Sequence, residues 1–248
     1  MRRLRFHVAY DGAEFHGWQV QPGLPTIQGM LETVIETIEK QPVRVEGSGR
    51  TDAGVHAYCQ VAAVSISNRI PTDNFRRAVN RLLPPSIRIS DVTEVDAGFH
   101  PRFQAKRKTY EYRIFREEVC PPFERRFVYH HPFPLDEDAM KEAAPVYEGE
   151  HDFSAFAAAD EKDALGYSKV RTVFKSSLER NGPRLIYRVE GSGFLKHMVR
   201  NMVGVLLEVG KHNLDRKELR ARLSGGAGIR PGPAAPARGL FLVSVEYE

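Results

Sequence analysis

A short loop of small residues holds the side chains best suited to chemistry. Residues 47–57 contain three glycines and two alanines, with Arg50 and Asp52 two positions apart. Glycine lets the backbone turn sharply and approach a ligand closely, at an entropic cost on folding. Since this stretch has so little to pack into a core, it predicts a site at which Asp52 offers a carboxylate and Arg50 a positive charge.

The residues alone leave three interpretations of Asp52. Asp-x-Gly is frequent in turns, so the loop could be an ordinary hairpin turn with solvated charges. A metal site would need further oxygen or imidazole ligands at workable spacing, and only His56 is close. A nucleophile would need an ionised carboxylate, which a buried site stabilises only with a cationic partner. Arg50, in the same loop, is a candidate for that partner.

The composition indicates a soluble, folded protein. The 248 residues are 42% hydrophobic and 10% aromatic, enough for a substantial core in one large domain or two small ones. A net charge of +4 suits a nucleic-acid partner without requiring one. Cys59 and Cys120 predict no disulfide, so we expect a reducing, cytoplasmic environment. We expect no signal segment and no membrane contact, because the longest apolar run, residues 202–210, is too short to span a bilayer.

Hydrophobic periodicity predicts two similar halves. Period-two alternation and helical stripes give the order strand, helix, strand, strand, helix, strand up to residue 95, and the second half is expected to repeat it. We therefore predict an α+β fold of two ferredoxin-like βαββαβ halves, residues 1–104 and 105–248. Their sheets would join into one mixed, mostly antiparallel sheet with helices packed on it. An active-site cleft would lie between the halves.

The expected bounds follow from the same patterns. In the first half, strands are expected at 4–10, 43–46, 60–67 and 87–95, and helices at 27–38, capped by Thr26, and 72–83. In the second half, strands are expected at 109–115, 170–179, 184–190 and 239–247, and helices at 136–147 and 195–209. Asn181-Gly182 predicts a tight hairpin turn.

Several motifs, in this order along nearly the whole chain, resemble the tRNA pseudouridine synthase A family. They are Tyr10–Gly12 with Trp18–Gln19, the loop 47–57, the strand around Tyr110, the segment 193–201 and the terminal segment 235–242. The resemblance implies a homodimer that converts uridine to pseudouridine at positions 38 to 40 of the tRNA anticodon arm. It implies no metal and no other cofactor.

The resemblance also assigns roles to four residues. Asp52 matches the nucleophile, and Arg200, in the His-Met-Val-Arg-Asn segment, matches the arginine that approaches it. Arg50 is then available to hold a phosphate or the space vacated by a flipped base. Tyr110 matches the first tyrosine of a Tyr-x-Tyr pattern and would stack on the uracil. Periodicity places Tyr112 on the same strand face, and a core tyrosine or an exposed polar helix face are the simpler alternatives.

Some questions stay open at this stage. Asp52 could attack the ribose C1′, act through a glycal intermediate, or attack C6 of the base. The basic residues Arg102, Lys106, Arg107 and Lys108 are either solvated surface or phosphate contacts that position RNA. Two other functions compete with the isomerase: a non-catalytic RNA-binding module, and a metal-dependent hydrolase that uses Asp52 and His56.

Overall fold

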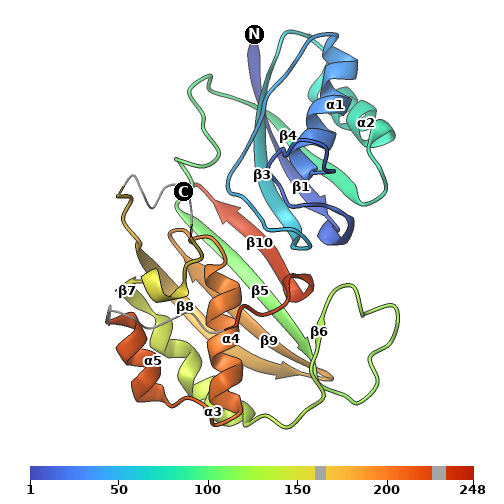
Figure 1. Cartoon of the computed structure of the whole chain (residues 1–248). Helices are drawn as coiled ribbons and strands as arrows, with labels where there is room; N and C mark the ends of the chain where they lie inside the picture. The colour runs from blue at the N-terminus through green and yellow to red at the C-terminus, as the bar shows by residue number, and fades with distance from the viewer. Residues whose placement is uncertain (160–165, 225–232) are drawn as a thin grey trace. The chain divides into compact units, whose positions relative to one another are not determined.

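The computed structural model describes residues 1–159, 166–224 and 233–248. The chain forms two compact units (Figure 1), Met1–Lys106 with Phe241–Glu248, and Arg107–Leu240. Helices and strands occur in both units, and strand pairing is antiparallel except for two parallel pairs in the described residues. The predicted α+β class with a mixed, mostly antiparallel sheet is therefore confirmed. No helix in these three ranges is long and apolar enough to cross a membrane.

The first unit has the predicted βαββαβ order, followed by a strand from the end of the chain. Its elements are β1 (Arg2–Tyr10), α1 (Ile27–Glu39), β2 (Val45–Gly47), β3 (His56–Ile66), α2 (Thr72–Leu82), β4 (Ile87–Val95) and β10 (Leu240–Glu246). The strand order is β4-β1-β3-β10, and β2 also pairs with β3. Only β10 runs parallel to its neighbour β3 in this unit; the other pairs are antiparallel.

Alternation along β1 separates the two faces of this sheet. Leu4, Phe6 and Val8 are fully buried, whereas Arg5 and His7, between them, are half-buried on the other face. The helices α1 and α2 lie together on the apolar face (Figure 1), where they complete the core. The opposite face carries Arg3, Arg5 and His7 of β1 beside the buried Val61 and Ala63 of β3.

The first helix begins at the predicted residue and ends one residue after the predicted Ile38. Thr26 caps α1, and its side chain accepts the N–H of Gly29 at 3.2 Å. The helix ends at Glu39 because Lys40 takes a left-handed conformation with φ 59°, two residues before Pro42. A left-handed residue after the last turn is a common way to end a helix.

The second unit contains a four-stranded antiparallel sheet with an added short strand. Its elements are β5 (Arg107–Phe115), β6 (Tyr129–His130), α3 (Glu137–Ala143), β7 (Gly149–Asp152), β8 (Val170–Asn181), β9 (Arg184–Gly191), α4 (Met198–Gly210) and α5 (Arg216–Leu223). The strand order is β5-β9-β8-β7, and β6 runs parallel to β5. The helices α3, α4 and α5 lie on one face of this sheet (Figure 1). The predicted hairpin is confirmed, with Gly182 at φ 55° between β8 and β9.

Two predicted helices are shorter than expected. The helix predicted over 136–147 is α-helical only to Ala143 and continues as a 3-10 turn from Ala144 to Tyr147. Pro145 lacks the N–H that an α-helical turn would use, which explains this change. The helix predicted from Leu195 begins at Met198, because His197 has a left-handed conformation with φ 60°.

Candidate active site

The glycine-rich loop joins β2 to β3. Strand β3 begins at His56, four residues before the predicted start, because β1 and β10 both pair with its first residues. The loop is therefore confined to residues 48–55 on a well-paired hairpin. Asp52 is half-buried near its middle, and Arg50 is exposed.

A buried glutamine holds the loop on the side that precedes Arg50. Gln60 is fully buried in β3, where an apolar strand residue would be expected. Its amide oxygen accepts the Ser48 hydroxyl, and its amide nitrogen donates to the Gly49 carbonyl at 3.0 Å. Because buried polar groups are costly unless they are hydrogen-bonded, this pairing fixes the backbone just before Arg50.

A buried tyrosine holds the residue next to Asp52. The Tyr10 hydroxyl lies 2.8 Å from Thr51 Oγ1, and both side chains are buried. Burial raises the pKa of Tyr10 far above its usual range, and hydrogen bonds with Thr51 and Gln60 offset this only in part. The hydroxyl therefore keeps its proton at working pH and contributes to a hydrogen-bond network that reaches both sides of Arg50.

The segment that follows β1 packs closely under the loop. The Trp18 N–H donates to the Thr51 carbonyl at 3.0 Å. Gly17, with φ 88°, approaches so closely that a Cβ there would lie 2.6 Å from the same carbonyl. Gly12 is tighter still, since its Cβ would lie 1.9 Å from the Val55 carbonyl. These contacts give the Tyr10–Gly12 and Trp18 motifs a physical role: they support the backbone that carries Asp52.

His56 is part of this support. It is 1% exposed, its Nδ1 accepts the Gly12 N–H at 3.1 Å, and Asp11 Oδ1 lies 3.2 Å from the same nitrogen. Its ring stacks on Phe241 with centroids 4.8 Å apart. In the described residues no group of three or more His, Cys, Asp or Glu side chains has an arrangement suited to a metal ion. The contacts of His56 with Gly12, Asp11 and Phe241 give it a supporting role beneath the loop.

The two tyrosines of β5 have different surroundings. Tyr110 is 8% exposed and meets the Phe194 ring edge-on, with centroids 5.1 Å apart. Tyr112 is fully buried, and its hydroxyl donates to the Pro236 carbonyl at 2.8 Å. Tyr112 is therefore a core residue, and Tyr110, although slightly more exposed, is also buried, with its ring against Phe194.

Arg200 lies on α4, whose polar side is covered. Asn201 is 3% exposed and donates to the Phe156 carbonyl at 2.7 Å. Arg200 is half-buried, and its Nε donates to the Ala235 carbonyl at 2.7 Å. The Ala235 N–H returns a bond to the Arg200 carbonyl at 3.0 Å. The polar side of α4 is therefore not an exposed surface, and the alternative of an exposed polar face is wrong. The segment 233–235 holds the side chain of Arg200.

The structure divides the basic cluster. Arg107 forms an ion pair with Glu190, and its guanidinium lies 4.9 Å from the centre of the Phe174 ring. Arg102 and Lys106 are exposed. Because a carboxylate neutralises part of the charge at Arg107, Arg102 and Lys106 are the better candidates for phosphate contacts.

A sequence profile described as tRNA pseudouridine synthase matches residues 7–104 and 143–248. The chain belongs to this family. Members of the pseudouridine synthase family are isomerases, so the predicted enzyme class is confirmed.

Relatives of this pseudouridine synthase match along its full length. A tRNA pseudouridine synthase A of Solibacter usitatus is 63% identical over 248 residues, which cover 100% of both chains. One from Brevibacillus brevis is 44% identical, again over 100% of both chains. Among solved structures, the archaeal box H/ACA sRNP Nop10-Cbf5 complex aligns at 14% identity and a TM-score of 0.32, over 82% of this chain and 43% of that one. A TM-score this low does not bear on the fold.

The four predicted site residues of this synthase fall in both units. Arg50 and Asp52 share the loop of the first unit, and Tyr110 and Arg200 belong to the second. The pairing of Arg200 with Asp52 stays a prediction. Tyr10, Gln60 and Thr51 form a supporting network that sequence reasoning did not identify. Gln60 could have indicated this network, because a glutamine inside an otherwise apolar strand needs buried hydrogen-bond partners.

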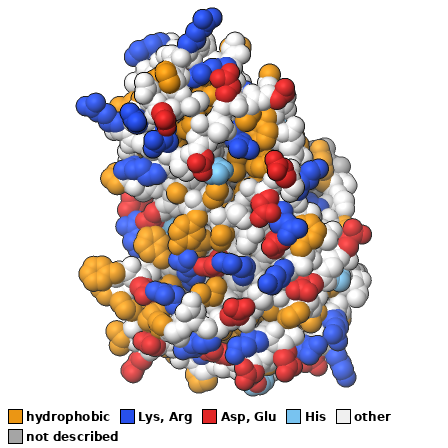
Figure 2. Space-filling model, turned by 180° about the vertical axis from the view of Figure 1, so that it is seen from behind, with side chains coloured by type: hydrophobic (Ala, Val, Ile, Leu, Met, Phe, Trp, Pro, Cys, Tyr) orange, Lys and Arg blue, Asp and Glu red, His pale blue; other side chains and the backbone are white. Residues whose placement is uncertain are grey.

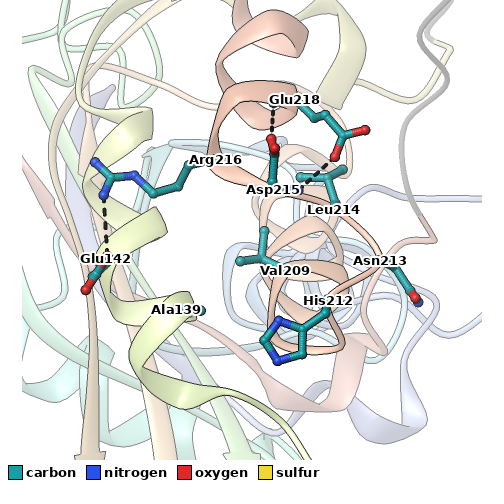
Figure 3. A pocket seen from close by; sticks show the side chains of 9 residues that line it. All are labelled: Ala139, Glu142, Val209, His212, Asn213, Leu214, Asp215, Arg216 and Glu218. Carbon is teal, nitrogen blue, oxygen red and sulfur yellow. Dashed lines mark hydrogen bonds and ion pairs between the residues drawn. The ribbon is translucent and has the colours of Figure 1, made fainter.

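The synthase also has a cavity of about 330 Å³ between α3, the end of α4 and the start of α5 (Figure 3). Its polar groups have partners within the protein, some of them outside the lining: His212 pairs with Asp136, and Asn213 donates to Glu208. Arg216 contacts Glu142 at 3.4 Å, and Asp215 and Glu218 form the capping box of α5. None of the four predicted site residues lines this cavity.

Proposed function

We propose that this pseudouridine synthase isomerises uridines 38 to 40 of the tRNA anticodon arm, with Asp52 as the nucleophile. The observation that carries the proposal is the support around Asp52. Gln60 holds Gly49, and Tyr10 holds Thr51, so the backbone on the N-terminal side of Asp52 is fixed by buried hydrogen bonds. Such preorganisation is what a reacting carboxylate needs, and an ordinary solvated turn does not need it.

The reaction needs no cofactor in this proposal. The bond between N1 of uracil and C1′ of the ribose breaks, the base rotates, and a bond between C5 and C1′ forms. The proton lost from C5 balances the one gained at N1, so the product is an isomer of the substrate. Asp52 acts by attack on C1′, by attack on C6, or through a glycal, and all three routes use its ionised carboxylate.

The other three residues bind the substrate. Tyr110 stacks on the uracil, and its ring, which meets Phe194 edge-on, supplies the aromatic face for this contact. Arg200 provides a positive charge for Asp52, and Ala235 holds it by two hydrogen bonds, one from the Arg200 Nε to the Ala235 carbonyl and one from the Ala235 N–H to the Arg200 carbonyl. Arg50 is exposed beside Asp52 and holds a phosphate or the space that the flipped base leaves. We further propose that the enzyme is a cytoplasmic homodimer.

One experiment tests the activity and its position together. The purified protein is incubated in EDTA with an unmodified tRNA that carries uridines at 38, 39 and 40, and pseudouridine is mapped along the chain. We expect modification at these positions and nowhere else. Modification elsewhere in the tRNA would refute the anticodon-arm assignment. Binding without any pseudouridine would favour the non-catalytic RNA-binding module, and activity that EDTA abolishes would favour metal-dependent chemistry.

A further inference from the structure

A large aromatic side chain is exposed in the connection between β4 and β5. Phe103 is 77% exposed, although the segment on either side of it is anchored to the first unit. We refer to residues 99–104 as the Phe103 turn. A phenylalanine that contributes so little to the core is a candidate contact for a ligand.

The Phe103 turn is well ordered by its own hydrogen bonds. The Gln104 N–H donates to the His100 carbonyl at 3.2 Å, and the His100 N–H donates to Gln104 Oε1 at 3.3 Å. The Arg102 N–H donates to His100 Nδ1 at 3.1 Å. Phe103 is therefore presented from a closed turn, and little entropy would be lost when a ligand orders it further.

The turn is also fixed to the face of the first unit's sheet that carries Arg3. Arg3 Nε donates to the Phe99 carbonyl at 2.6 Å, and the Tyr247 hydroxyl donates to the Pro101 carbonyl at 2.8 Å. The Phe99 and Tyr247 rings also touch, with centroids 5.2 Å apart. The base of the turn is thus held by both ends of the first unit's chain, while its tip projects into solvent.

Positive charge lies beside the exposed ring. The Arg102 guanidinium lies 5.9 Å from the centre of the Phe103 ring, and both Arg102 and Lys106 are exposed. The surface visible in Figure 2 mixes Lys and Arg with Asp and Glu, so no broad basic field dominates that face. RNA contacts on such a surface depend on local combinations of an aromatic ring with a cation.

We propose that the Phe103 turn binds an unpaired nucleotide of the RNA substrate. Its base stacks on the Phe103 ring, and Arg102 contacts an adjoining phosphate. This proposal rests on the proposed function, because it takes tRNA as the substrate, and it adds a contact outside the loop that carries Asp52. Every base has a face that can stack on a ring, so the contact adds affinity without selecting a sequence.

The test compares three substitutions at Phe103, which is too exposed to be needed for folding. Phe103→Tyr keeps an aromatic face and should bind tRNA like the wild type. Phe103→Leu keeps an apolar side chain without a ring, and should weaken tRNA binding roughly 5- to 100-fold, with KM affected more than kcat. Equal affinity of the leucine, tyrosine and wild-type proteins would overturn the proposal. Equal weakening in the leucine and tyrosine variants would also overturn it, because stacking requires the ring alone.

Phe103→Trp gives a direct optical readout. The chain contains one other tryptophan, Trp18, which is 2% exposed. We expect tRNA to quench the emission of the new tryptophan, with a midpoint equal to the binding constant, because an indole stacked on a base is quenched. Leu82→Trp is the matched control: Leu82 is 51% exposed at the end of α2, in the helix layer of the same unit. An equal change in both variants would contradict the proposal.

Arg102 is tested by salt. Arg102→Ala should reduce the slope of log affinity against log salt by about 0.7, the value for one phosphate contact on single-stranded RNA. An unchanged slope would show that Arg102 does not contact a phosphate. Pseudouridine formation by the wild type is measured in parallel. If the wild type modifies tRNA while the Phe103 variants bind normally, this inference alone fails; if the wild type does not modify tRNA, the proposed function fails.

Discussion

Tyr10→Phe removes one oxygen atom from beneath the candidate catalytic loop and changes almost nothing else. The lost hydroxyl lies 2.8 Å from Thr51 Oγ1, and both groups are buried. A buried hydrogen bond contributes about 0.5–1.5 kcal/mol, and a partner left unsatisfied costs about 1–3 kcal/mol. Since Thr51 keeps its hydroxyl in this variant, we expect a loss of about 1–2 kcal/mol in the free energy of unfolding.

The same change should slow the reaction. Thr51 precedes Asp52, so a looser Thr51 allows the carboxylate to leave its reactive position. Each kcal/mol of lost positioning slows a reaction about five-fold, and we expect kcat to fall by about that factor while KM for tRNA changes little. Urea unfolding gives the stability and steady-state pseudouridine formation gives kcat and KM.

A double-mutant cycle separates this hydrogen bond from general effects on packing. Thr51→Val removes the partner hydroxyl at nearly the same volume, and Tyr10→Phe with Thr51→Val should cost about 1 kcal/mol less than the sum of the two single changes. Additive costs would show that the two hydroxyls are not coupled. A Tyr10→Phe variant with wild-type stability and wild-type kcat would refute the argument that this network positions Asp52.

Three further outcomes follow from contacts in both units. Tyr110→Leu should reduce pseudouridine formation. Tyr112→Phe should lower the free energy of unfolding in urea by about 1–2 kcal/mol and leave tRNA affinity unchanged, because it removes only a core hydrogen bond. The reverse pattern would show that Tyr112 contacts the substrate and that Tyr110 is the core residue. Gly12→Ala should cost about 3 kcal/mol or more and lower kcat, because its Cβ would collide with the Val55 carbonyl, and a fully active, stable variant would contradict this. Burial raises the pKa of the Glu111 carboxyl, but hydrogen bonds and charges from two arginines outweigh burial and lower the pKa below its usual 4.5. The contribution of Glu111 to stability is therefore complete above about pH 4.5 and is lost as the pH falls through the lowered pKa. Glu111→Gln should reduce this acid-dependent loss of the free energy of unfolding, measured in urea at acidic pH. An unchanged pH dependence would show that Glu111 does not cause the loss.

Much of the fold could be predicted because its patterns are local. The alternation of Leu4, Phe6 and Val8 specifies β1, and the apolar stripe after Thr26 specifies α1 with its cap. The bounds of some helices and strands were predicted wrongly because they depend on backbone conformations and strand pairings that hydrophobic periodicity does not reveal. The left-handed backbone of His197 delays α4, and the pairing of β10 with the start of β3 extends that strand to His56.

The candidate site was predictable only in part. The glycine-rich loop and its carboxylate are contiguous in sequence, so the residues alone single out Asp52 as a candidate, and its role as the nucleophile stays a prediction from the resemblance. Its supporting groups, Tyr10 and Gln60, are distant in sequence from the loop's centre or hidden in an apolar strand, and only the strand register brings them beneath Thr51 and Gly49. The ion pair of Arg107 with Glu190 could not be predicted, because Glu190 comes from a strand more than 80 positions away, and phosphate binding by the basic cluster stays a prediction.

Asp52→Asn tests the central claim most directly, because it keeps the shape of the side chain and removes its nucleophilicity. Pseudouridine formation in unmodified tRNA should fall at least about 10³-fold, while tRNA binding stays within a few-fold of the wild type. Asp91→Asn is the matched control: Asp91 belongs to the same unit, its side chain is 71% exposed, and this variant should modify tRNA at the wild-type rate. An Asp52→Asn enzyme that retains more than a few per cent of the wild-type rate would contradict the assignment of Asp52 as the catalytic carboxylate.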